Sequence, residues 1–116
     1  MDKLTHYRKA ITEALEHYAT IGYAHKERHP DAFDLQLLFD RDRDHYQLLG
    51  LGWNGNHQTC LVIFHFAIQH GKVWLHRNVA NYDILEDIEA RGVPKEDIVL
   101  AFQPPAIRQY TGYAVA

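Results

Sequence analysis

The chain has 116 residues, of which 47% are hydrophobic and 23% charged, and its 12 Lys and Arg against 15 Asp and Glu give a net charge of −3. This composition is typical of a globular protein, and the length predicts a single domain over residues 1–116. The cationic residues alternate with acidic ones, as in the run from Arg41 to Asp44, so the sequence offers no basic stripe of the kind that autonomous DNA binding requires. One cysteine excludes an internal disulfide and a cysteine-based zinc cluster. Because the sequence has no apolar run of transmembrane length and no signal peptide, we expect a cytoplasmic protein.

Residues 2–20 have the periodicity of an amphipathic helix. Asp2 is the expected N-cap, and Gly22 lies where a helix would end. Residues 23–32 are polar and finish in His-Pro-Asp, which predicts a loop. Apolar side chains recur at steps of three and four, a pattern that predicts one buried face: Leu4, Tyr7, Ile11, Ala14, Leu15 and Tyr18.

Two strands follow this loop. Residues 33–39 alternate between apolar and polar, as a half-exposed strand does, and residues 45–53 predict a second strand. The Asp40–Asp44 turn between them resembles a calcium loop only in part. His45 and Leu51 stand where that loop needs glycine and glutamate, so we expect a solvated turn with local Asp–Arg pairing.

The stretch from Thr59 to Arg77 predicts the central hairpin. Cys60–Ile68 is an apolar strand, His70-Gly71 is a two-residue turn, and Lys72–Arg77 returns antiparallel with Ala67 opposite Trp74 and His65 opposite His76. One face of this hairpin is the predicted core: Cys60, Val62, Phe64, Phe66, Ile68, Val73 and Leu75. The other face carries Ala67, Trp74, His65 and His76.

The register between residues 45–53 and 59–68 depends on the turn at Asn54-Gly55. A two-residue loop sets Gln47 opposite Val62, whereas a three-residue loop, Asn54-Gly55-Asn56, sets Leu48 there and Tyr46 opposite Phe64. The longer loop gives the better core, and we favour it. It also sets His45 opposite His65, so that His45, His65 and His76 would form a row across three strands.

The last third of the chain predicts a second helix over residues 82–89, capped by Asn81 or Asp83 and ended by Gly92. A single turn at Lys95–Asp97, a short strand over 98–102 and a last strand within 107–116 complete the pattern. The order of elements predicts an α+β fold: an N-terminal helix, a four-stranded antiparallel meander, a second helix, and a short C-terminal strand and tail. Both helices should pack on one face of the sheet.

Two long stretches carry a family resemblance: FDRDRDHYQLLGLGW (residues 39–53) and RGVPKEDIVLAFQPPAIRQYTGYAVA (residues 91–116). With the opening MDKLTHYRKAI and the segment GKVWLHRN, the chain resembles XisI-like proteins, the fdxN-element excision controlling factors. The resemblance implies a role in programmed excision of a DNA element by a site-specific recombinase, beside XisH-like proteins that resemble nucleases. It transfers no catalytic residue and no cofactor to this chain.

We therefore expect a non-enzymatic accessory factor that acts by contact with an XisH-like protein. Aromatic and arginine side chains dominate such contacts, which makes Trp53, Trp74, Arg108 and Tyr110 the candidate partner-binding residues. An uncovered second face of the sheet would also favour a homodimer through it.

Two alternatives remain open. His45, His65 and His76 would suit a metal-binding module or small enzyme, since three imidazoles with an open fourth position are a known zinc pattern. A weak DNA-binding accessory protein would rely on dispersed cations: Arg77, Arg91, Lys95 and Arg108.

Overall fold

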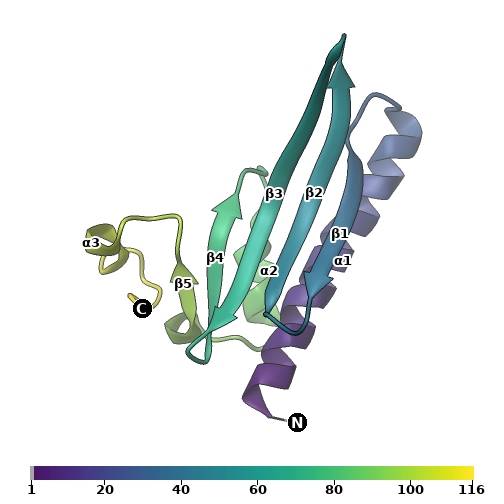
Figure 1. The fold of residues 1–116 in the computed structure, drawn as a ribbon. Coiled ribbons are helices and arrows are strands. Elements are labelled where there is room, and N and C mark those ends of the chain that lie inside the picture. Colours follow the sequence, from purple (N-terminus) through teal and green to yellow (C-terminus); the bar gives the residue numbers. More distant parts are fainter. Residues whose placement is uncertain (1) are drawn as a thin grey trace.

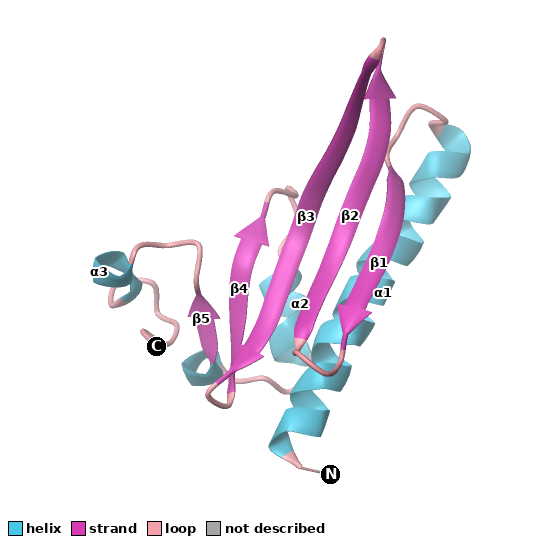
Figure 2. Cartoon of the chain, in the orientation of Figure 1, coloured by secondary structure: helices cyan, strands magenta, loops and turns pink. Residues whose placement is uncertain are grey.

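The computed structural model describes residues 2–116 and has a five-stranded sheet with its two longest helices on one side of it (Figures 1 and 2). The strand order is β1-β2-β3-β4-β5, with the first four strands antiparallel and β5 parallel to β4. The predicted α+β fold and element order are confirmed. The elements are α1 (Lys3–Arg28), β1 (Asp34–Asp40), β2 (His45–Asn54), β3 (His57–Gln69), β4 (Lys72–Asn78), α2 (Ile84–Ala90), the 3-10 helix η1 (Lys95–Asp97), β5 (Ile98–Leu100) and α3 (Pro105–Arg108).

The first helix begins as predicted but ends later. The Asp2 side chain accepts a hydrogen bond from the Thr5 amide at 2.8 Å, which confirms the N-cap. The helix then continues through Gly22 to Arg28, so the predicted end at Gly22 and the loop from Tyr23 are wrong. A Cβ at Gly22 would lie 2.2 Å from Leu35 Cδ1, so this glycine lets α1 approach β1 closely.

The β3–β4 hairpin turns where predicted. His70 and Gly71 both have positive φ, 53° and 76°, as a two-residue turn of type I′ requires. Ala67 pairs with Trp74 as expected. His65, however, pairs with Arg77 rather than with His76, because a bulge after Leu75 leaves His76 without a partner of its own on β3.

Neither predicted register between β2 and β3 is correct. The turn consists of Gly55 and Asn56, and Asn54 pairs with His57. This register differs by one residue from the one that the favoured three-residue loop would give. A β-bulge at the Leu48/Leu49 step shifts the register by one further residue. On the Leu48 side of this bulge, Tyr46 lies opposite Phe66 and His45 lies opposite Ala67.

This bulge exchanges the two faces of β3. On the C-terminal side of the bulge, Phe64, Phe66 and Ile68 point into the core, as predicted, and so does Ile63 at the bulge itself. On the N-terminal side of the bulge, the alternation between core-facing and outward-facing residues is reversed relative to the prediction. Val62 is therefore only half-buried and Cys60 is exposed. The predicted core positions of Cys60 and Val62 are therefore wrong.

The C-terminal segment is less regular than predicted. Asp83 caps α2 by accepting from the Glu86 amide, and Gly92 follows the helix with φ 99°, as expected. The strand β5 ends at Leu100, short of the predicted Phe102. In place of a last strand over 107–116 the chain forms α3 and then makes a single bridge from Ala114 to β5.

The hydrophobic core lies between the sheet and the two helices α1 and α2. Tyr18 of α1 packs edge-on against Phe64 of β3, with ring centres 5.0 Å apart. The largest core side chains without solvent exposure come from α1, α2 and four strands: Tyr46, Phe64, Phe66, Ile11, Leu15, Leu48, Leu75, Ile84, Ile88 and Ile98. Within residues 2–116, none of the helices combines the length and the apolar character needed to cross a membrane.

Candidate functional site on the open face of the sheet

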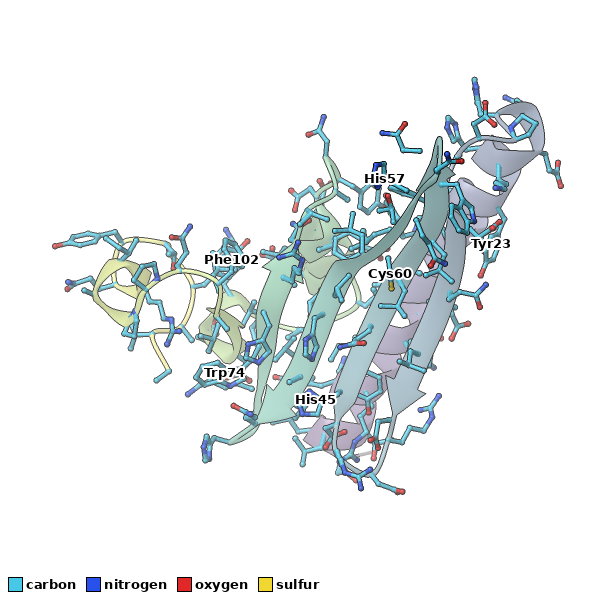
Figure 3. All side chains as sticks on the ribbon, turned by 45° about the horizontal axis from the view of Figure 1, so that its top comes forward. Tyr23, His45, His57, Cys60, Trp74 and Phe102 are labelled. Carbon is cyan, nitrogen blue, oxygen red and sulfur yellow. The ribbon has the colours of Figure 1, made fainter. Side chains whose placement is uncertain are left out.

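The candidate site is the face of the sheet opposite α1 and α2, which we call the open face. Figure 3 shows His45, Cys60 and Trp74 projecting from this side. The alternation along β2 defines it: Tyr46 and Leu48 point to the helices and are buried, whereas neighbouring residues of opposite parity, such as Leu49, are half-exposed. An antiparallel sheet with one face in water normally carries polar residues on that face, so apolar residues there need an explanation.

One part of the open face is apolar. Leu49 lies opposite Val62, and Leu51 lies opposite Cys60 on the neighbouring strand. Two side chains at the margins of this group are strongly exposed, Leu38 at 56% and Trp53 at 69%. We call this group the apolar patch: Leu38, Leu49, Leu51, Trp53, Cys60 and Val62.

The distribution of glycines makes the apolar patch unusual. The helix-facing positions of β2 beyond Leu48 are Gly50 and Gly52, whereas the outward positions are leucine and tryptophan. A Cβ at Gly52 would lie 2.8 Å from the Phe33 ring, and one at Gly50 would lie 3.2 Å from it. Phe33 thus occupies the space that two side chains would need, and the larger side chains of this part of β2 all face outward.

A second part of the open face holds the imidazole row, His45, His65 and His76. His45 Nδ1 lies 3.0 Å from His65 Nε2, and the rings of His65 and His76 are 5.2 Å apart. The row forms although the predicted pairing does not occur. Gln47 lies directly opposite His65, so His45 is the diagonal neighbour of His65. The bulge after Leu75 in β4 turns His76 towards His65.

Two imidazoles of this row, those of His65 and His76, have lowered pKa values and so favour the neutral state. Burial lowers the pKa of His65 below its usual value of 6.5, and the neighbouring His76 and His45 lower it further. Burial also lowers the pKa of His76, as do His45 and the guanidinium of Arg108. In the part of the chain that the structure describes, no three His, Cys, Asp or Glu side chains have the arrangement of a metal site.

The third part of the site is the C-terminal tail, which is attached to the β4–β5 side of the sheet. The Arg108 guanidinium donates to the carbonyls of Gln103 (3.0 Å) and Ala101 (3.2 Å) and lies 5.5 Å from the centre of the Trp74 ring. Trp74 itself donates from Nε1 to the carbonyl of Gln69. Arg108 is therefore occupied in holding the tail in place.

Further contacts fix the end of the tail. The Tyr113 hydroxyl donates to Glu89 at 3.1 Å, and burial together with this hydrogen bond raises the pKa of Tyr113 to about 12. The amide of Ala114 donates to the carbonyl of Ile98 at 2.8 Å. The tail nevertheless exposes large apolar side chains, which we call the tail surface: Phe102 (47% exposed), Ile107 (45%) and Tyr110 (77%).

The four predicted partner-binding residues thus fall in two places. Trp74 and Arg108 are in contact, and Tyr110 follows two residues later on the tail surface. Trp53 lies at the tip of the β2–β3 hairpin, eight residues or about 27 Å along β2 from His45 at the other end. The sequence analysis missed Leu38, Leu49 and Leu51, although the shared parity of Leu49, Leu51 and Trp53 with His45 was a usable signal.

The fold and this site define a small α+β protein with one covered and one uncovered face of its sheet. The family model described as XisI protein matches residues 1–115, and the chain belongs to this family. It is similar to the crystal structure of the fdxN element excision controlling factor XisI from Anabaena variabilis, with 36% identity, a TM-score of 0.81, and coverage of 99% of this chain and 100% of that one. It is also similar to a XisI-like protein from the same organism, with 34% identity, the same TM-score and the same coverage. No protein with a curated description matches the chain.

Proposed function

We propose that this protein is a non-enzymatic controlling factor that acts through contact with a nuclease-like protein of the XisH type. The observation that carries the proposal is membership of the XisI family over essentially the whole chain, together with the full-length match to a structure described as an excision controlling factor. A role in controlling DNA excision comes to this chain from that similarity.

The tail surface is the contact surface we favour. Its three side chains are large and apolar or aromatic, which are the properties that contribute most at protein interfaces. The tail is already held by Arg108, Tyr113 and Ala114, so little conformational entropy would be lost on binding. Tyr110, the most exposed of the three, is the expected anchor.

The net charge of −3 supports a way in which contact could control a nuclease. A nucleic-acid groove on a nuclease is basic, and an acidic protein at its margin competes with DNA through charge complementarity. On this proposal the XisI-family protein regulates its partner by occupying or narrowing the groove.

Co-expression with a tagged XisH-type protein tests the proposal. We expect the two proteins to co-purify, and we expect Tyr110→Ala to weaken the complex at least about tenfold, since a central aromatic anchor is typically worth about 2 kcal/mol. Tyr23→Ala is the matched control, because Tyr23 is a 47% exposed tyrosine on α1. Failure of the unsubstituted proteins to associate at micromolar concentration refutes the partner, and equal effects of the two variants refute the tail surface.

A further inference from the structure

We propose that His76 and Arg108, which both adjoin the Trp74 ring, bind a dianionic oxyanion of the phosphomonoester class. The other two imidazoles of the row lie behind His76 and make the binding depend on pH. The site requires neither the tail surface nor a protein partner, so this inference does not depend on the function proposed above.

The Trp74 ring brings the two binding groups together. The rings of Trp74 and His76 are stacked, with centres 6.3 Å apart and planes 20° from parallel, and the Arg108 guanidinium lies 5.5 Å from the Trp74 ring centre. Trp74 is itself fixed by its hydrogen bond to the carbonyl of Gln69 at 3.1 Å. An imidazole and a guanidinium are therefore held as neighbours before any ligand binds, which reduces the entropy lost on binding.

Both groups have donors to spare. A guanidinium has five N–H groups, and Arg108 uses two of them on the carbonyls of Gln103 and Ala101. His76 is half-buried, and within residues 2–116 no side chain or carbonyl forms a hydrogen bond with its ring nitrogens. Charge-assisted hydrogen bonds from such donors are the usual means of binding phosphate.

His65 has a different role, because its two nitrogens already face other side chains. Its Nε2 lies 3.0 Å from His45 Nδ1, and its Nδ1 lies 3.5 Å from Gln47 Nε2. His65 and His45 therefore act on the ligand through charge rather than through direct contact.

Positive charge around His76 is not balanced locally. Burial, His45 from β2 and Arg108 from the tail all lower the pKa of His76. His65 from β3 is affected in the same way, by burial and then by His76 and His45. Arg77, the next residue of β4, is exposed and adds one more positive charge. An anion beside His76 would reverse this repulsion.

The acidic residues near the row do not supply that anion. Asp40 and Asp44 lie at the other end of the row, where Asp40 pairs with His45 across β1 and β2 and Asp44 precedes His45 in the chain. Each already has a cationic partner: Asp40 binds Arg43 at 3.0 Å, and Asp44 binds Arg8 at 2.7 Å. The His76 end of the row is thus left to an external anion.

The charge of the ligand follows from this electrostatic arrangement. A bound anion raises the pKa of His76, so binding takes up a proton where the free imidazole is neutral. The interaction energy scales with the charge of the ligand, which favours a phosphomonoester, with a charge of about −1.5 to −2 at pH 7, over a singly charged phosphodiester or carboxylate.

Titration of the full chain with sodium sulfate tests the proposal, because sulfate stays a dianion throughout the pH range used. Ionic strength is held constant with sodium chloride, and the imidazole and guanidinium signals are followed by NMR. We expect saturable shifts of the His76 and Arg108 signals, with a dissociation constant of about 1–10 mM at about pH 6 and binding about tenfold weaker at about pH 8.

His76→Gln is the deciding variant, because it removes the titrating group and leaves the contacts of Arg108 with the tail in place. We expect it to abolish the dependence of sulfate binding on pH. His29→Gln is the matched control, since His29 is an exposed histidine at the end of α1 that also stacks on another ring, that of His25, at 4.2 Å. We expect its sulfate binding to match that of the unsubstituted protein.

A short single-stranded oligonucleotide without a terminal phosphate supplies the phosphodiester comparison. Binding of this oligonucleotide at the His76 signals as tightly as sulfate overturns the assignment to a dianion. The absence of saturable His76 shifts up to about 50 mM sulfate, or equal sulfate affinity in His76→Gln and the unsubstituted protein at about pH 6, overturns the site itself. Neither result bears on co-purification with an XisH-type protein, so the two proposals fail separately.

Discussion

The adjacent residues Leu48 and Leu49 provide a direct test of which face of β2 is the core. They are the same residue type, next to each other on one strand, and point to opposite sides of the sheet. Leu48 is completely buried against the helices, whereas Leu49 is only half-buried on the open face. We predict that truncation of each to alanine has very different costs.

The magnitude follows from burial. Leu→Ala at a fully buried position removes buried methyl groups and leaves a cavity, which costs about 2–5 kcal/mol, so we expect about 3 kcal/mol for Leu48→Ala. That corresponds to a fall in Tm of about 12 °C for a domain of this size. Leu49→Ala leaves no enclosed cavity in a single copy, and we expect a loss of about 1 kcal/mol or less.

Urea denaturation of the two variants and the unsubstituted protein measures the two costs. The midpoint should fall clearly for Leu48→Ala and little for Leu49→Ala, with the denaturant slope unchanged in both.

Equal destabilisation by the two variants would refute the assignment of faces. It would mean that the β-bulge is absent or shifted, because a slip of one residue exchanges the sides to which β2 and β3 point. A larger cost for Leu49 than for Leu48 would place the core on the opposite side of the sheet.

Two further predictions concern the imidazole row and a helix end. Acidification from about pH 7.5 to about pH 5.5 should lower Tm. The reason is that folding lowers the pKa values of His65 and His76 below their usual 6.5. The stability that these two residues contribute is present above pH 6.5 and is lost as the pH falls through the lowered pKa values. The variant His65→Gln should show a flatter dependence on pH, and an unchanged slope would contradict this. Gly92→Ala should cost more than Gly55→Ala in thermal unfolding. Both have positive φ, which costs an alanine about 1 kcal/mol, but only at Gly92 would the new Cβ meet a neighbour, His6 Nε2 at 2.7 Å. Equal costs would show that the His6 ring moves aside freely.

Features that depend on residues close together in the sequence could be predicted from it. The caps at Asp2 and Asp83 and the positive φ of Gly92 follow from short-range hydrogen bonding and backbone sterics. The His70-Gly71 turn follows from the demand for two positive φ angles. The order of helices and strands, and hence the α+β class, follows from the period of the hydrophobic pattern.

The rest was decided by contacts between distant parts of the chain. Gly22 was expected to end α1, but it lies within the helix because Leu35 of β1 packs against it. The bulge beside Leu48 cannot be read from β2 or β3 alone, since an extra residue is tolerated only where the partner strand and the core allow it. That bulge determines that Cys60 and Val62 face outward.

The sequence by itself therefore determined the order of the main helices and strands, and which residues are apolar or titratable. Only the tertiary structure decided on which side of the sheet they lie. The side chains of a strand alternate with a period of two, so a single inserted residue reverses every later position, and long-range packing selects where that insertion falls. For this reason the apolar patch emerged only from the fold. The imidazole row was expected from the sequence, but it forms in a register that the sequence pattern did not predict.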